Sequence, residues 1–67
     1  MKMKEFREMR FESIKRIIVK QTEMLIKDEF PSYKIDEINL GTIDAATKIY
    51  KFNKKQVNEL KNLANLS

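Results

Sequence analysis

The sequence predicts an all-α fold, a small bundle of about four helices, and three observations support this fold class. Apolar residues recur every three or four positions along most of the chain, which is typical of amphipathic helices. Pro31 and Gly41 are the only strong helix breakers, and they separate three helical pieces. The chain has 67 residues and no cysteine, so residues 1–67 are expected to form a single domain around one small core.

The first piece predicts one long amphipathic helix within residues 1–30. At 100° per residue, its apolar stripe consists of Phe6, Ile14, Ile17, Met24 and Leu25. A competing interpretation makes residues 1–11 a strand, followed by a helix from Ser13, as in ribbon-helix-helix repressors. The apolar residues of that segment alternate only if Phe6 is ignored.

The long helix carries more apolar surface than one small core would cover. Val19 and Ile26 lie one heptad apart and outside the main stripe. A chain this short needs a further stabiliser, and without cysteine or histidine it lacks disulfides and the usual zinc ligands. We therefore expect a homodimer built on this helix, with contacts from Ile18, Val19, Leu25 and Ile26. Two other helices of the same chain that cross this helix would account for the same surface.

Residues 31–41 predict a short second helix. Ser32 is suited to cap its N-terminus, and Ile35 and Ile38 lie one turn apart. Gly41 is expected to end this helix, because glycine readily adopts the left-handed conformation found at helix C-termini.

Residues 42–66 predict two further helices joined by a tight turn. The first begins after Thr42 and ends near Tyr50, and the turn lies at residues 52–53. The second helix occupies residues 54–65. Its inner face is expected to consist of Val57, Leu60, Leu63 and Ala64.

This arrangement resembles the helix-turn-helix of DNA-binding regulators over residues 43–62. In that family the first helix carries a small residue and, one turn later, an apolar one, and the turn carries an apolar residue and a helix cap. Lys51 stands where the family usually has Gly. The residues that carry the resemblance are Ala46, Tyr50, Phe52, Asn53, Val57 and Leu60.

The resemblance implies that the second helix enters the major groove of double-stranded DNA, as in small regulators of phage or plasmid type. Asn58 could bind adenine, Lys55 guanine, and Glu59 the amino group of cytosine. Its outward residues are Lys54, Lys55, Asn58, Glu59 and Asn62. Phosphates would be held by Lys48, Lys51 and Lys61, and by backbone N–H groups at the helix start after Thr42.

Charge is distributed unevenly, in a way that favours a polyanionic partner. The net charge is +4, and residues 51–67 carry four Lys and one Glu. The densest excess of positive charge therefore coincides with the expected recognition helix.

Other classes of function find little support in the residues. The chain has no His, Cys or Trp and only one Gly, so neither an enzyme nor a cofactor or metal site is expected. No apolar run suits a membrane span or a signal peptide, and a cytoplasmic protein without membrane contact is expected. The alternative function is a small helical inhibitor or adaptor that binds another protein, which the wide apolar surface and four Met residues favour.

Overall fold

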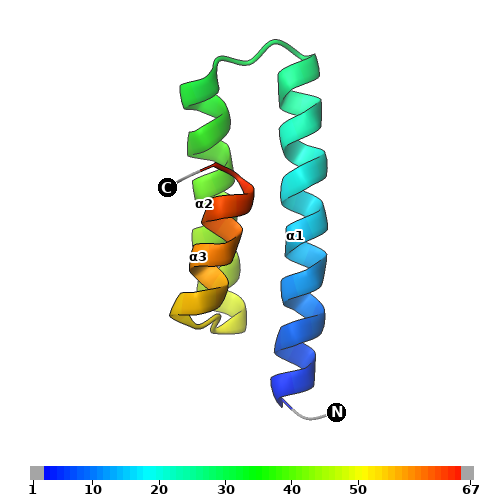
Figure 1. The fold of residues 1–67 in the computed structure, drawn as a ribbon, viewed down its shortest axis with the longest axis vertical. Coiled ribbons are helices and arrows are strands. Elements are labelled where there is room, and N and C mark those ends of the chain that lie inside the picture. The colour runs from blue at the N-terminus through cyan, green and yellow to red at the C-terminus, as the bar shows by residue number, and fades with distance from the viewer. Residues whose placement is uncertain (1–2, 66–67) are drawn as a thin grey trace.

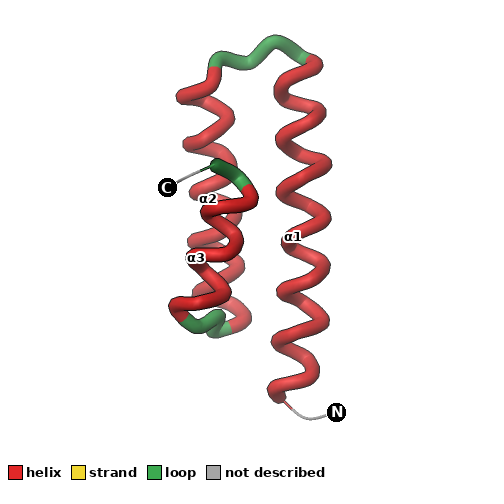
Figure 2. The backbone as a smooth tube through the Cα atoms, in the orientation of Figure 1, coloured by secondary structure: helices red, strands yellow, loops and turns green. Residues whose placement is uncertain are grey.

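The structure, a computed structural model that describes residues 3–65, contains three helices and no strand within that range. α1 comprises Met3–Lys27, α2 comprises Ser32–Tyr50 and α3 comprises Lys54–Leu63. α1 and α2 form an antiparallel hairpin, and α3 turns back to lie against both of them (Figures 1 and 2). The hairpin extends beyond α3 at the end where α1 connects to α2 (Figure 1). The all-helical fold class is confirmed, whereas a strand over residues 3–11 is wrong.

The expected boundary at Gly41 is wrong, because α2 continues through it as one helix of 19 residues. Gly41 has no positive φ, and apart from its chain neighbours and the backbone of its own helix no heavy atom lies within 4 Å of the position that a Cβ would take. Glycine inside a helix costs about 0.5–1 kcal/mol relative to alanine. Burial of apolar side chains on both sides of it, such as Ile35 and Ile43, outweighs that cost.

Both expected caps within this region are also corrected. Pro31 occupies the N-cap position of α2, and its carbonyl accepts the N–H groups of Lys34 and Ile35 at 3.0 and 3.1 Å. Ser32 is therefore the first helical residue instead of the cap. Thr42 lies in the middle of α2, so it starts no helix.

Residues other than glycine end the helices. Glu29 follows α1 with φ 64°, and its N–H donates to Ile26 O at 3.0 Å. Lys51 follows α2 in the left-handed conformation with φ 58°, and its N–H donates to Thr47 O at 2.9 Å. Lys51 thus adopts the conformation for which the helix-turn-helix family usually has glycine.

All three helices and the second turn contribute to one core. Its buried residues are Phe11, Ile18, Ile43, Ala46, Phe52, Leu60 and Ala64. The inner positions predicted at Ala46, Leu60 and Ala64 are confirmed, and Val57 packs against the core while partly exposed. Leu63 was expected inside but is 41% exposed.

Aromatic rings attach α1 to the α2–α3 turn. Phe52, the residue predicted to fill the turn, is buried, and its ring lies 5.7 Å from that of Phe11 and 5.8 Å from that of Tyr50. Phe6 lies 6.1 Å from Tyr50 in an edge-to-face arrangement. The start of α1 therefore lies beside the turn that leads into α3.

Candidate nucleic-acid interface

The first turn of α3 is held by a capping box. Asn53 Oδ1 accepts the N–H of Gln56 at 2.8 Å, and Gln56 Oε1 accepts the N–H of Asn53 at 3.0 Å. The cap predicted at Asn53 is confirmed, and Gln56 is the partner that completes it. This pair fixes where α3 begins and therefore which residues face outward.

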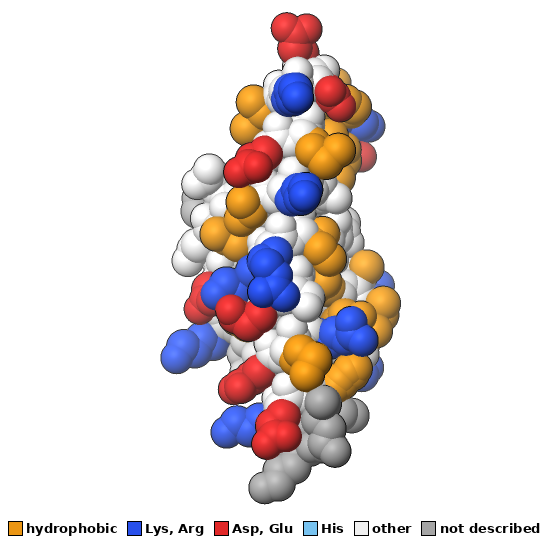
Figure 3. Space-filling model, turned by 90° about the vertical axis from the view of Figure 1, so that its right-hand side faces the viewer, with side chains coloured by type: hydrophobic (Ala, Val, Ile, Leu, Met, Phe, Trp, Pro, Cys, Tyr) orange, Lys and Arg blue, Asp and Glu red, His pale blue; other side chains and the backbone are white. Residues whose placement is uncertain are grey.

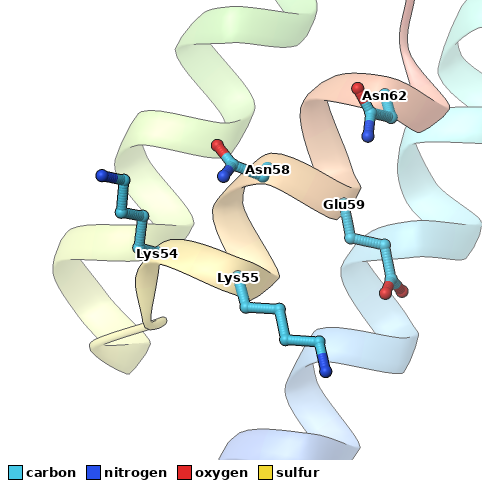
Figure 4. Close-up of a pocket in the computed structure, with 5 residues that line it drawn as sticks. All are labelled: Lys54, Lys55, Asn58, Glu59 and Asn62. Atoms are coloured by element: carbon cyan, nitrogen blue, oxygen red, sulfur yellow. The ribbon is translucent and has the colours of Figure 1, made fainter.

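The five residues expected on the outward face of α3 do share one surface. A shallow depression is lined by Lys54, Lys55, Asn58, Glu59 and Asn62. Figure 4 shows that Lys54 and Asn58 lean toward α2, whereas Lys55 and Glu59 lean toward α1. The face therefore has two sides of different character.

The side of this face next to α1 is partly acidic. Glu59 pairs with Lys15 Nζ at 3.2 Å, and Lys15 also pairs with Glu12 at 3.3 Å. The hydrogen bonds from Lys15 to Glu59 and then to Glu12 raise the pKa of the Lys15 ammonium above its ordinary value. Because Glu59 already has this partner and Glu8 lies in the same cleft, this side is less suited to contact phosphates than the side next to α2.

The side next to α2 is basic. No acidic residue occurs between Asp44 and Glu59, and this stretch contains four Lys. Lys48 and Lys51 are exposed at the end of α2, immediately before the exposed residues that begin α3.

The N-terminal cations of α1 extend this basic region. Arg10 lies 5.2 Å from the centre of the Phe6 ring and 5.8 Å from that of Tyr50. α1 therefore adds basic residues at the end of the molecule where α3 begins. Residues 4–10 and 45–58 together carry seven Lys and Arg and two Glu. We call this region the basic end.

Two of the expected phosphate contacts have different surroundings. The hydroxyl of Thr42 accepts from Gln21 Nε2 at 3.2 Å and donates to Ile38 O at 3.2 Å, within a helix that continues on both sides. Thr42 therefore offers no free helix start to an anion, and its expected role is corrected. Lys61 is partly buried on the last turn of α3, away from the basic end.

The crossing of α2 and α3 differs from the geometry of the resembled family. DNA-binding helix-turn-helix units cross at about 90–120°, whereas α3 here runs back along the hairpin (Figure 1). The spacing of residues in the turn matches the family, but the packing is that of an αα-hairpin.

A buried polar cluster between α1 and α2 was not anticipated from the sequence. Asn39 is fully buried, and its Nδ2 donates to Thr22 Oγ1 at 2.8 Å while its Oδ1 accepts from Gln21 Nε2 at 2.9 Å. Asn39 lies four residues after Ile35 and four before Ile43, so it falls on the inner stripe of α2. Because Gly41 was expected to end a helix, Ile35, Asn39 and Ile43 were not predicted to share one inner stripe.

The residues expected at a dimer contact lie in different environments. Ile18 is fully buried in the core of its own chain, so it has no surface left for a second copy, and its expected role is corrected. Leu25 is partly buried. Val19 and Ile26 are 42% and 62% exposed.

Neither comparison with known proteins nor a search for a membrane span or a metal site assigns a function. A comparison of the chain with family models, curated proteins and solved structures found no match. Within residues 3–65, no helix combines the length and apolar character that crossing a membrane requires. The same part of the chain holds no group of three or more His, Cys, Asp or Glu side chains placed to bind a metal ion.

Proposed function

We propose that this protein binds double-stranded DNA through the first turns of α3 and the adjoining basic end, and that it acts as a regulator in a two-copy form. The observation that carries this proposal is the run of four exposed Lys between residues 48 and 55, with no acidic residue from 45 to 58. Such a cluster attracts phosphates and releases their counterions. The capping box holds Lys54 and Lys55, the two of these residues that belong to α3, at a defined helix start.

The two sides of the α3 face determine how DNA would approach. Lys54 and Asn58 lean toward α2, away from the carboxylate of Glu59 (Figure 4). In this approach Asn58 contacts a base edge, for which adenine presents the matching donor and acceptor. Lys48 and Lys51 contact phosphates and position the helix without reading sequence.

Two copies are part of the proposal for a geometric reason. α3 has ten residues, so it reaches only a few base pairs of one groove. Two recognition helices on half-sites about one turn of DNA apart give the contact area that specific binding needs.

The test replaces the proposed DNA-binding side chains without disturbing the fold. Changing Lys54, Lys55 and Asn58 together to Ala should alter the free energy of unfolding by no more than about 0.5 kcal/mol, because all three are exposed. Mobility shifts with random duplex DNA at about 50 and 200 mM salt should show weaker binding and a flatter salt dependence, by about 0.9 in slope for each phosphate that the variant no longer neutralises.

A charge-matched control separates this face from a general effect of net charge. Lys20→Ala with Lys27→Ala removes the same number of cations from exposed positions on α1, and this variant should bind DNA like the parent. Equal weakening of binding in both variants, or no binding by the parent at about 50 mM salt, would contradict the proposal.

A second candidate function rests on a different observation. Among the residues that the structure describes, ten large apolar side chains are at least 40% exposed, including Ile17, Met24 and Ile49. Surfaces of this kind suit contact with another protein, as in an inhibitor or adaptor. Absence of salt-dependent DNA binding, together with a monomeric parent, would make this candidate the leading one.

A further inference from the structure

The side of α1 that faces away from α3 carries an uncovered apolar row. Val19 and Leu63 line the same depression, so the side of α1 that bears Val19 faces α3. Ile17 precedes Val19 by two positions and therefore lies about 200° around the helix from it. Phe6, Ile17 and Met24 follow one another at spacings of 11 and 7 residues, which places them on one line of α1.

A matching row lies on α2. Phe6 and Ile49 line one cavity of about 210 Å³, together with Arg7, Tyr50 and Lys51. The side of α2 that bears Ile49 therefore adjoins the row on α1. Ile38 precedes Ile49 by 11 residues and lies on the same line of α2.

These two rows form one surface, which we call the rear face of the hairpin: Phe6, Ile17, Met24, Ile38 and Ile49. Ile17, Met24 and Ile49 are 49%, 58% and 68% exposed, so no described helix covers them. Figure 3, which looks onto α1, shows apolar side chains along both edges of this helix. α3 occupies only the opposite side of the hairpin (Figure 1).

Charges of opposite sign lie at the two ends of the rear face. Asp28 directly follows α1, and its N–H donates to Met24 O at 3.0 Å, so helical geometry continues to this residue. Arg10 and Asp28 are 18 residues apart, which is about five helical turns, so they lie on nearly the same line with Ile17 and Met24 between them. The basic end lies beside Arg10. The opposite end of the molecule, residues 23–37, carries five Asp and Glu and two Lys.

We propose that a second copy of this chain docks on the rear face in an antiparallel orientation, so that two hairpins form a four-helix bundle. In this orientation Arg10, where the basic end adjoins the rear face, lies beside Asp28 at the acidic end of the second copy. A parallel pairing would instead bring like charges together at both ends. The charge pattern therefore selects both the occupant and its direction.

The same register accounts for the cavity at the basic end. If Arg10 of one copy lies opposite Asp28 of the other, the cavity beside Phe6 and Arg7 lies level with the connection between α1 and α2 of the second copy. That connection carries Phe30, which is 40% exposed. An apolar ring beside an acidic residue, Glu29, matches a cavity that is lined by apolar side chains and by the cation Arg7.

This inference is independent of the proposed function, because docking rear face to rear face leaves the two α3 helices on opposite outer sides of the bundle (Figure 1) and not side by side on neighbouring half-sites. It does not involve the outward face of α3. Failure of one can therefore be distinguished from failure of the other, because the mass of the protein is measured without DNA.

The first test compares two variants of α1 by sedimentation equilibrium over a range of concentrations up to high micromolar. Ile17→Ser with Met24→Ser should raise the dissociation constant of the dimer about tenfold or more, because it removes two apolar side chains from the rear face. Val19→Ser with Ile26→Ser is the matched control on the opposite side of the same helix, and this variant should remain dimeric. Circular dichroism verifies that both stay helical.

The second test determines orientation through a charge exchange. Arg10→Asp alone and Asp28→Arg alone should each weaken the dimer, and the double variant should restore it, since each charge again meets its opposite. In a parallel dimer the double variant would still bring like charges together. Arg10 also stacks on Phe6 and Tyr50, so the folded state of each variant is verified by near-ultraviolet circular dichroism.

Three outcomes would overturn the inference: a parent that stays monomeric at high micromolar concentration, a dimer that dissociates equally or more readily with the Val19 and Ile26 changes, or a charge exchange that fails to restore association. A monomeric parent would leave the rear face to a different protein. A monomer that still binds DNA would overturn this inference and leave the proposed DNA binding intact.

Discussion

At the scale of single residues, two positions are occupied by residues that do not favour the backbone conformation found there. Gly41 lies inside a helix, and Lys51 adopts the left-handed conformation with φ 58°. Glycine weakens a helix through its conformational freedom, while a side chain in the left-handed region is strained by about 1 kcal/mol. Both positions are set by the packing of α2 and of Phe52, which lies in the turn.

Gly41→Ala should increase the free energy of unfolding by about 0.5–1 kcal/mol. The backbone is helical there, and beyond the chain neighbours and the backbone of its own helix the added Cβ would meet nothing within 4 Å. The change therefore restricts the unfolded chain without creating a clash. Urea unfolding at one fixed protein concentration measures the effect. Ala45→Gly, at an exposed position of the same helix, is the control and should lower stability by a similar amount. Destabilisation by Gly41→Ala would show that close packing at this position needs glycine.

At the scale of the elements, the α1–α2 hairpin combines an apolar core with a buried polar cluster. Asn39 connects to Gln21 and Thr22 of α1, and Gln21 also reaches Thr42. These hydrogen bonds form only when the two helices lie in one register, whereas apolar contacts tolerate sliding. The cluster therefore specifies how the hairpin aligns.

Asn39→Ala should lower the free energy of unfolding by about 1–3 kcal/mol, because Gln21 and Thr22 would then be without their buried partner. Thermal and urea unfolding provide the measurement. Asn62→Ala, which changes an exposed Asn on α3, should shift stability by less than about 0.5 kcal/mol. Equal effects of the two changes would mean that the cluster contributes nothing to stability.

At the scale of the whole molecule, the protein has one hydrophobic core, and its positive and negative charges are concentrated at opposite ends of the hairpin. Buried residues from α1, α2 and α3 form a single cluster, so no helix has a core of its own. A small chain with one core is expected to unfold cooperatively. The charge separation acts over the length of the hairpin and affects association more than folding.

Leu60→Asp should unfold the whole chain and not α3 alone, since it places a charge at a fully buried position that all three helices share. The far-ultraviolet circular dichroism and the near-ultraviolet signal of the aromatic residues should disappear together. Leu63→Asp, three residues later and 41% exposed, should leave the protein folded. Retention of native helical content by the Leu60 variant would contradict a shared core.

Local patterns in the sequence were sufficient for several features. Periodicity predicted the all-helical class and the long first helix, because side-chain spacing reports directly on helical geometry. The turn with buried Phe52, the cap at Asn53 and the inner position of Leu60 were also predicted. The shared outward face of α3 followed from the same spacing.

Only the tertiary structure decided the rest. The continuity of α2 through Gly41 depends on burial against α1 and α3, which exceeds the local preference of one residue. The partners of Asn39 and the burial of Ile18 depend on contacts between segments distant in the sequence. The sequence by itself therefore determined the helices and their faces. Tertiary packing determined that Gly41 is tolerated inside a helix, that Asn39 is buried and that the rear face of the hairpin stays uncovered. Each of these depends on which other helix packs against the residue.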